Sequence, residues 1–419
     1  MNPSKKSIAI DAIKKKLIGQ RLSYQEIFAL MDEIANHKLG PILTTYFAAA
    51  GFKEGFSNNE LYYLTKAMAE TGDKLHFSGI VADKHSTGGI SGTRTTMILV
   101  PIIAAAGIKI PKNSSRAITT PSGTADTMEV LAPVTFTPRQ IEQIVNKVGG
   151  CIVWGGHLGL APADDIIIQV EEPLAFESFD KIIISVLAKK VASGANHVII
   201  DIPVGPTVKI KHFNDAEVIA KKFINLGKRF NIKIITDVSQ ILEPAGRGIG
   251  SSLEARDVLR VLEQLPDRPL ALESKALKLS GRLLDLCFSD MKGKKVGTGE
   301  EVAVEILKSG KALEKMRQII KIQGGNPNIS SSKIELGKFK EEIRSLKKGR
   351  IIGFDNHQLT VVGKILGAPA DKKAGLFLSR RIEEKVDKDD ILFVIYSSDK
   401  WRLQEAKETV KTMPIFKIE

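Results

Sequence analysis

The feature that most constrains the fold is a regular alternation that begins near residue 80. From there, short runs of β-branched residues, glycine-rich turns and amphipathic helices follow one another. This order of strand, loop and helix is typical of an α/β domain with a largely parallel sheet. The expected strands are 80–82, 151–154, 197–202 and 233–237, and the expected helices include 95–106, 137–148 and 180–193.

The segments on either side of this region show different sequence patterns. Ser23 with Glu26 and Ser57 with Glu60 form capping-box patterns ahead of apolar residues at helical spacing, which predicts short N-terminal helices. After a run rich in Lys and Ser over 308–348, the tail is rich in β-forming residues. We therefore expect a small all-helical domain over 1–73 joined by 160–192, a larger α/β domain with a central, mostly parallel sheet over 74–159 and 193–330, and a C-terminal α+β domain over 331–419.

The composition limits the partners of the chain. Lys and Arg number 61 against 48 Asp and Glu, and this net charge of +13 favours anionic partners without choosing among phosphates, nucleotides, nucleic acid and acidic membranes. Five Tyr and two Trp are few for stacking on single-stranded nucleic acid. Cys151 and Cys287 form no metal-binding or disulfide pattern, and no apolar run is long enough to act as a leader or membrane span. We expect a cytoplasmic protein with no membrane partner and no nucleic-acid partner.

The densest group of chemically active residues is 83–89, directly after an expected strand. Its glycines let backbone N–H groups approach an anion, and Lys84 supplies a positive charge. The hydroxyls of Ser86 and Thr96 can donate hydrogen bonds near the N-terminus of the next helix. The segment predicts a phosphate-binding loop, although a solvated glycine turn would have a similar sequence, and the pattern is not that of a P-loop.

A second polar cluster lies at 114–126. It places six hydroxyls, one guanidinium and a glycine within eleven residues, which can coordinate several oxygens of one oxyanion. Surface loops are also rich in Ser and Thr. Two such clusters on either side of one helix favour a common anion site.

The same segments resemble a known family over nearly the whole chain. Residues 84–89, 114–116, 123–126, 244–250 and 253–256 are similar to the motifs of the thymidine phosphorylase family. Residues 115–120, 153–156, 160–165 and 201–206 resemble the AMP phosphorylase branch of that family more than its pyrimidine nucleoside branch.

The resemblance implies phosphorolysis, in which inorganic phosphate attacks the anomeric carbon and the base departs. It implies no metal, no cofactor and no covalent enzyme intermediate, with phosphate as co-substrate. In the AMP branch a nucleoside 5′-monophosphate gives free base and ribose 1,5-bisphosphate. The alternatives are a thymidine phosphorylase, which gives thymine and 2-deoxyribose 1-phosphate, an anthranilate-type phosphoribosyltransferase, which needs magnesium, and a basic nucleic-acid-binding protein.

The resemblance also assigns residues. The expected phosphate-binding residues are Lys84, Ser86, Gly89, Thr96, Ser114 and Thr124. The expected substrate-binding residues are Ser115, Arg116, Ala117, Ile118, Thr119, Thr120, Ser185, Lys189 and Lys209. Lys209 stands where the nucleoside branch has an apolar residue, so we expect it to neutralise a 5′-phosphate, although a solvated surface lysine beside Lys211 would have the same sequence.

Two residues compete for the role of proton donor to the leaving base. Glu177 corresponds to an acidic donor that is usually Asp, and it would need a raised pKa. His85 has the more suitable ordinary pKa, but Lys84 and Arg94 lie near it in the chain. The base-reading Arg of the pyrimidine branch aligns near 170–172, where this chain has Val-Glu-Glu, which argues against the usual recognition of a pyrimidine.

The resemblance bears on assembly as well. AMP phosphorylases carry a further N-terminal domain, and this chain begins where that domain would end, so it is either a short homologue or a shortened chain. We expect a homodimer through the N-terminal helices.

Overall fold

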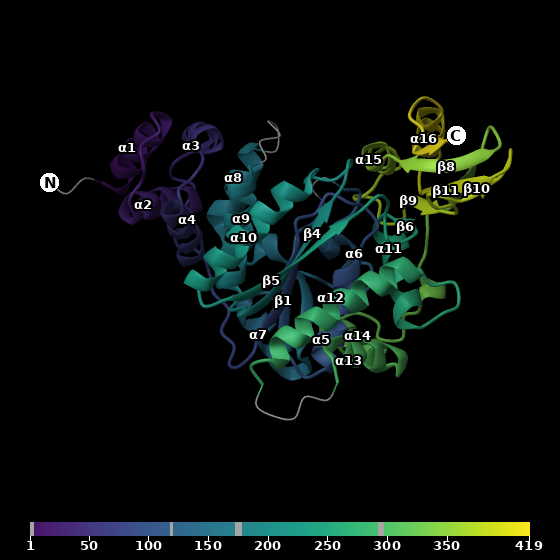
Figure 1. Ribbon diagram of the computed structural model, residues 1–419, viewed down its shortest axis with the longest axis horizontal. Helices are drawn as coiled ribbons and strands as arrows, with labels where there is room; N and C mark the ends of the chain where they lie inside the picture. Colours follow the sequence, from purple (N-terminus) through teal and green to yellow (C-terminus); the bar gives the residue numbers. More distant parts are fainter. Residues whose placement is uncertain (1–3, 118–119, 172–177, 292–296) are drawn as a thin grey trace.

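The computed structural model describes residues 4–117, 120–171, 178–291 and 297–419 (Figure 1). A helical bundle stands at one end, an α/β domain in the middle and a smaller α+β domain at the other end, as expected from the sequence. The bundle consists of α1 (Lys5–Leu17), α2 (Tyr24–Ala35), α3 (Pro41–Glu54), α4 (Asn58–Glu70), α8 (Pro162–Glu171) and α9 (Phe179–Ala192). Both predicted capping boxes are present. Helices α8 and α9 pack against α2, α3 and α4, although they follow them by about ninety residues in the chain.

The central sheet is parallel throughout. Its strands are β1 (Ala82–Ser86), β2 (Ile110–Ser114), β3 (Gly150–Trp154), β4 (His197–Val204) and β5 (Lys233–Gln240). They form two ladders, β1-β4-β5 and β2-β3. A bridge between Val81 and Lys109 joins the ladders at the amino ends of β1 and β2. The carboxyl ends of all five strands therefore lie at one edge, which is where such sheets carry their sites.

The sheet differs from the expectation at two strands. We predicted a strand over 80–82 followed by a polar loop, but β1 begins at Ala82 and includes Asp83, Lys84 and His85. The strand β2 was not predicted, because its sequence IPKNS contains Pro and three polar residues. Both strands are almost wholly buried, and their charged side chains pair with one another across the sheet, so hydrophobicity alone does not reveal them.

Helices cover both faces of this sheet. They are α5 (Thr95–Ala105), α6 (Thr124–Met128), α7 (Pro138–Val148), α10 (Phe213–Arg229), α11 (Ser251–Leu262), α12 (Leu270–Phe288), α13 (Gly299–Lys308) and α14 (Lys311–Ile322), with a 3₁₀ turn η1 (Gly155–His157) after β3. The first ten residues of α5 are all buried, and the helix packs against α12 and α14. This central position fixes the N-terminus of α5 at the carboxyl edge of the sheet.

The C-terminal part combines two small sheets with two helices. Its elements are η3 (Ser331–Lys333), β7 (Phe339–Arg344), β8 (Gly349–Phe354), α15 (Asn356–Ile365), β9 (Gly375–Leu378), β10 (Lys385–Val386), β11 (Ile391–Ser397), α16 (Lys400–Thr412) and β12 (Phe416–Ile418). One sheet has the order β6-β9-β11-β7, in which β6 (Gly248–Ile249) comes from the α/β domain. This shared sheet attaches the C-terminal domain firmly. Among the described residues, no helix combines the length and apolarity needed to cross a membrane.

Candidate active site

The first predicted phosphate-binding residues lie at the carboxyl end of β1. Ser86 is the register partner of Asp201 on β4, and its hydroxyl accepts a hydrogen bond from the amide of Gly88 at 3.4 Å. The Nζ of Lys84 lies 3.6 Å from Oδ2 of Asp201, and Lys275 approaches Oδ1 at 3.0 Å. Burial lowers the pKa of Lys84, against the attraction of Asp201. An oxyanion placed beside Lys84 would raise this pKa and favour the charged ammonium, so the lysine suits anion binding.

The second group lies across from it, at the end of β2 and the start of α6. Ser114 ends β2, and Thr124 opens α6. Between them the chain turns back on itself, so that a β-carbon at Gly123 would lie 2.4–2.7 Å from backbone atoms of residues 115–117. The absence of a side chain at Gly123 therefore allows the two hydroxyl-bearing segments to touch.

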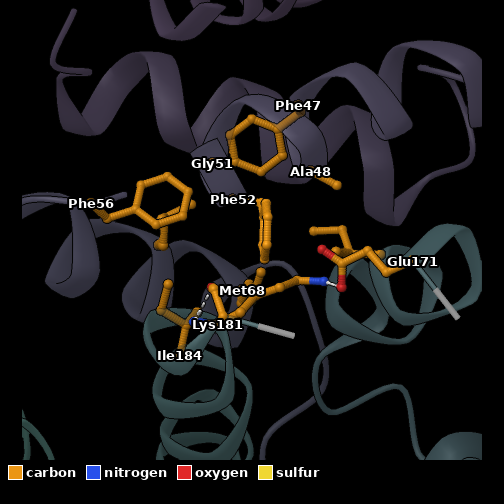
Figure 2. A pocket seen from close by; sticks show the side chains of 12 residues that line it. Phe47, Ala48, Gly51, Phe52, Phe56, Met68, Glu171, Lys181 and Ile184 are labelled. Atoms are coloured by element: carbon orange, nitrogen blue, oxygen red, sulfur yellow. Dashed lines mark hydrogen bonds and ion pairs between the residues drawn. The ribbon is translucent and has the colours of Figure 1, made fainter. Parts of the chain in front are cut away.

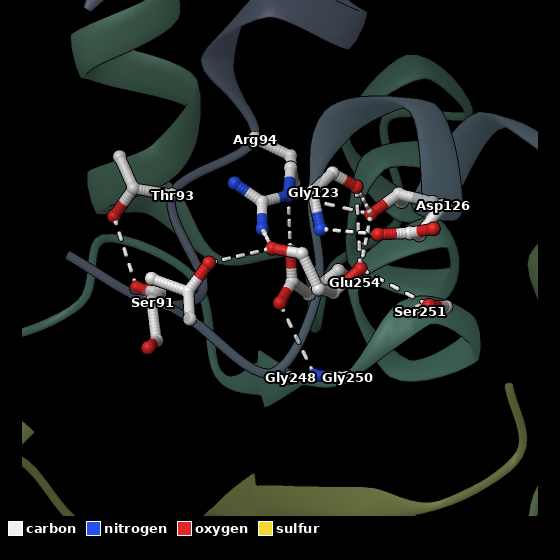
Figure 3. A network of polar contacts seen from close by, with 12 residues as sticks. Ser91, Thr93, Arg94, Gly123, Asp126, Gly248, Gly250, Ser251 and Glu254 are labelled. Carbon is white, nitrogen blue, oxygen red and sulfur yellow. Dashed lines mark hydrogen bonds and ion pairs between the residues drawn. The ribbon is translucent and has the colours of Figure 1, made fainter. Parts of the chain in front are cut away.

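A network of buried polar side chains links the start of α5 to the turn before α6 and to α11 (Figure 3). Arg94, directly before α5, forms an ion pair with Glu254 of α11 and donates to the carbonyl of Ser122. Its Nε lies 3.3 Å from Oγ1 of Thr127, and the hydroxyls of Ser122 and Ser251 are 3.1 Å apart. Burial raises the pKa of Glu254 to about 7, although Arg94 opposes this shift. The network fixes the start of α5, and with it Thr96, relative to α6.

Three buried polar groups that were not predicted as site residues lie in the same region. The hydroxyls of Thr87 and Thr95 and the side-chain N–H₂ of Asn113 are buried, yet each has no hydrogen-bond partner among the described residues. Each adjoins a predicted phosphate-binding residue in the chain: Ser86, Thr96 and Ser114 respectively. Buried donors are nearly always paired in native proteins, so these groups are candidates for contact with a bound anion. Only their proximity to the predicted residues could have revealed them in the sequence.

A fully buried carboxylate links three elements below the site. Asp83 of β1 forms ion pairs with Lys190 of α9 and with Lys112 of β2, the latter at 3.4 Å. Burial lowers the pKa of Lys112 to about 7, against the attraction of Asp83. Lys190 thereby attaches α9 to β1, the strand that carries Lys84. The resemblance assigns base binding to α9, so this ion pair holds the expected base-binding helix next to the phosphate-binding loop.

His85 lies half-buried between these charges. Burial lowers its pKa well below the ordinary value, and four lysines lower it further: Lys190, Lys112, Lys84 and Lys189. The imidazole is therefore neutral at pH 7. It can donate a proton to a leaving group only where a bound dianion compensates for these lysines.

Ser185 and Lys189 lie one turn apart on α9, as predicted, and share one partner. The hydroxyl of Ser185 donates to Oδ2 of Asp164 at 2.7 Å, and Lys189 approaches the same oxygen at 2.9 Å. Lys189 also pairs with Asp165 at 3.2 Å. Burial lowers the pKa of Lys189, but the two carboxylates outweigh burial and the pKa lies above its usual value.

Gly89 and Lys209 are brought together from distant parts of the chain. Gly89 has a φ of +98°, which favours glycine, and a β-carbon there would lie 2.9 Å from the backbone nitrogen of Lys209. The lysine expected to neutralise a 5′-phosphate therefore adjoins the phosphate-binding loop. No sequence spacing could have shown this contact.

The run 115–120 is described in part. Arg116 pairs with Asp126 at 2.9 Å and with Glu129 at 2.7 Å, and its guanidinium lies over the ring of Trp154. Hydrogen bonds from Arg116 lower the pKa of Glu129 to about 2. The guanidinium is thus held by protein carboxylates.

The other members of that run differ in exposure. Ser115 is exposed, the amide of Ala117 donates to Asp126, and the hydroxyl of Thr120 donates to the carbonyl of Ser122 at 2.8 Å. Ile118, Thr119 and the predicted proton donor Glu177 lie outside the described residues.

A separate apolar cavity lies within the helical bundle (Figure 2). Its walls come from α3, α4, α8 and α9 and include Phe47, Phe52 and Met68, with the ion pair of Glu171 and Lys181 at one side. Of the predicted site residues that the structure describes, none lines this cavity.

Comparisons with known proteins agree with this architecture. Residues 78–313 match the α/β domain of a glycosyl transferase family, 10–72 match its helical bundle domain, and 351–415 match the pyrimidine nucleoside phosphorylase C-terminal domain. The chain resembles anthranilate phosphoribosyltransferase from Thermus thermophilus in fold, with a TM-score of 0.57 and 17% identity over 75% of this chain and 99% of that one. The fold and these matches define a pentosyltransferase of the nucleoside phosphorylase class.

Relatives at higher identity narrow the class. AMP phosphorylase from Methanococcus vannielii is 46% identical over 404 residues, which cover 96% of this chain and 79% of the relative. AMP phosphorylase from Methanospirillum hungatei is 42% identical over 407 residues, covering 97% and 78%. The chain belongs to the AMP phosphorylase family.

Proposed function

We propose that this enzyme cleaves the N-glycosidic bond of a nucleoside 5′-monophosphate, with AMP as the preferred substrate, by attack of inorganic phosphate. The products are the free base and ribose 1,5-bisphosphate. The observation that supports the choice of a nucleotide is the close approach of Gly89 to the backbone and Cγ of Lys209, which brings a second lysine, and with it a positive charge, to the phosphate-binding loop. A nucleoside has no 5′-phosphate to use that charge.

The proposed reaction needs two groups held in line. Phosphate bound by Lys84, Ser86, Gly89, Thr96, Ser114 and Thr124 would supply the oxygen that forms the new bond to the anomeric carbon. Positive charge grows on the sugar as the carbon–nitrogen bond breaks, and the phosphate dianion stabilises it. The electron pair of the broken bond leaves with the base, which must gain a proton.

The base would be held by α9 through Ser185 and Lys189. Both side chains already share Asp164, so the helix presents a hydroxyl and an ammonium that are fixed in direction. Because His85 is neutral at pH 7, it can act as proton donor only in the complex with phosphate. Glu177 stays the other candidate for this role.

The proposal also covers the co-substrate, the location, the assembly and the domain bounds of the enzyme. We infer that inorganic phosphate is the only co-substrate and that no metal or organic cofactor takes part. We also infer a cytoplasmic homodimer formed through the N-terminal helices. The domains are proposed to run over 1–73 with 160–192, over 74–159 with 193–330, and over 331–419.

Release of free base tests the activity. The protein is incubated with phosphate and, separately, with AMP, CMP, UMP, thymidine and uridine, and the freed base is quantified. Phosphate-dependent release of adenine above the other bases is expected. Release from thymidine alone would place the chain with thymidine phosphorylases. Activity that requires a ribose pyrophosphate donor and disappears with a chelator would instead indicate a phosphoribosyltransferase.

A further inference from the structure

One helix of the C-terminal domain contacts the loops on which the proposed site is built. The side-chain amide of Asn356, the first residue of α15, donates from Nδ2 to the carbonyl of Gly89 at 2.6 Å. The same nitrogen lies 3.4 Å from the carbonyl of Thr207, two residues before Lys209. Its Oδ1 accepts a hydrogen bond from the amide of Ser91 at 3.1 Å. A single side chain thus joins the phosphate-binding loop to the Lys209 loop.

The rest of the helix continues this contact. The hydroxyl of Thr360 lies 3.4 Å from that of Ser91 and donates to the carbonyl of Asn356 at 2.9 Å. A β-carbon at Gly363 would lie 2.7 Å from Cγ of Pro121, so the backbone of α15 packs directly on the turn that leads to Thr124. Three segments of the α/β domain therefore rest on one face of α15, beside the carboxyl edge of the sheet (Figure 1).

The chemistry of this contact is specific to an amide. Asn356 is 5% exposed and Ser91 is fully buried, so water cannot replace their hydrogen bonds. The amide uses its acceptor on one backbone group and its donors on two others. Asp355, which caps the helix by accepting from the amide of Gln358 at 2.9 Å, fixes the position of Asn356. None of the three backbone partners belongs to the C-terminal domain, so the amide serves the α/β loops.

We propose that Asn356 is a positioning residue, which sets the distance between the bound phosphate and the 5′-phosphate of the nucleotide by holding the Gly89 loop against the Lys209 loop. The inference rests on the proposed function for the identity of the two anions. The C-terminal domain then takes part in substrate binding through α15, without touching the substrate itself.

The test compares two substitutions, each of which removes hydrogen bonds between the C-terminal domain and the α/β domain. Asn356→Asp keeps the shape and the acceptor but removes both N–H donors and sets an oxygen against the carbonyl of Gly89. Arg381→Met is the control, because Arg381 also comes from the C-terminal domain and donates to three carbonyls of the α/β domain, those of residues 244–246. Both variants lose contacts between the domains, but only the first loses contacts to the proposed substrate loops.

The readouts are KM for AMP, KM for phosphate and kcat, together with the rise in melting temperature that inorganic phosphate produces. In Asn356→Asp, KM is expected to rise at least about 10-fold for AMP, with a smaller change in kcat and a reduced rise in melting temperature. In Arg381→Met, both KM values and the effect of phosphate stay at the wild-type level. Asn356→Ser, which keeps one donor, is expected to fall between wild type and Asn356→Asp and serves if the aspartate variant does not fold.

Failure of the inference is separable from failure of the proposed function. If the wild type releases no base from any nucleotide, the proposed function is refuted, and the protection by phosphate still compares the variants. Unchanged KM and unchanged protection in Asn356→Asp overturn the inference. An equal rise of KM in Arg381→Met also overturns it, because the effect would then come from general loosening of the domains.

Discussion

Replacing Gly123 with alanine tests whether the two hydroxyl-bearing segments must touch. The φ of Gly123 is −98°, which alanine adopts without strain, so the substitution acts only through the added methyl group. That methyl would lie 2.4 Å from the carbonyl carbon of Arg116, 2.6 Å from the carbonyl oxygen of Ser115 and 2.7 Å from the amide nitrogen of Ala117. All three are backbone atoms and cannot rotate away. The segment 114–117 must therefore move by about 1 Å from Thr124.

A displacement of this size at a reacting centre costs about 10²-fold in rate. The expected result is a fall of that order in kcat/KM for phosphate, measured from initial rates of base release at fixed AMP. Overpacking also lowers the free energy of unfolding by about 1–3 kcal/mol, so stability must be measured in parallel.

Gly107→Ala is the matched control. Gly107 follows α5 with a φ of +83°, and no described atom lies within 4 Å of its added β-carbon. Alanine there costs about 1–2 kcal/mol of backbone strain but displaces nothing. It should lower the melting temperature and leave kcat/KM unchanged. The reasoning is refuted if Gly123→Ala keeps the wild-type kcat/KM, or if Gly107→Ala loses as much.

Two further predictions concern charge. Lys209→Ala should raise KM for AMP far more than KM for adenosine or thymidine, because only AMP carries the 5′-phosphate; equal effects in steady-state assays on all three would remove this role. His85→Asn should reduce the loss of stability in acid: because the folded pKa of His85 lies below its unfolded value, the unfolded chain takes up a proton that the folded chain refuses as the pH falls through about 6.5. The wild type should therefore lose up to about 1.4 kcal/mol more per pH unit than the variant below that pH, in denaturant titrations without phosphate, and identical slopes would contradict the pKa shift.

The layered architecture could be predicted from the sequence because it depends on local patterns. Capping boxes at Ser23 and Ser57 and the apolar strand that begins at His197 are visible within a few residues. The bounds of β1 were predicted wrongly and β2 was not predicted, and both differences have one physical reason. Asp83 and Lys112 are buried as an ion pair, and each looks like a surface residue until its partner in the other strand is known.

The candidate site was predictable as two polar clusters but not as one place. Lys84 lies on β1 and Ser114 ends β2. Because β2 was not predicted, the sequence did not show that the two residues lie at the same edge of one sheet. The contact of Gly89 with Lys209 and the hydrogen bonds of Asn356 span over a hundred residues of chain, and no periodicity encodes them. Thr87 and Asn113 stand beside predicted residues, but only packing determines that the Thr87 hydroxyl and the Asn113 side-chain N–H₂ find no hydrogen-bond partner among the described residues.

The bridge between Val81 and Lys109 has a consequence for the size of the anion that the site can accept. The carboxyl halves of β1 and β2 belong to different ladders, so backbone pairing does not fix the width between Lys84 and Ser114. The salt bridge from Asp83 to Lys112 spans that seam instead, and a side chain can be lengthened or shortened where a ladder cannot. Evolution could therefore have fitted anions of different size into one scaffold by exchanging side chains at the seam, with the sheet left intact.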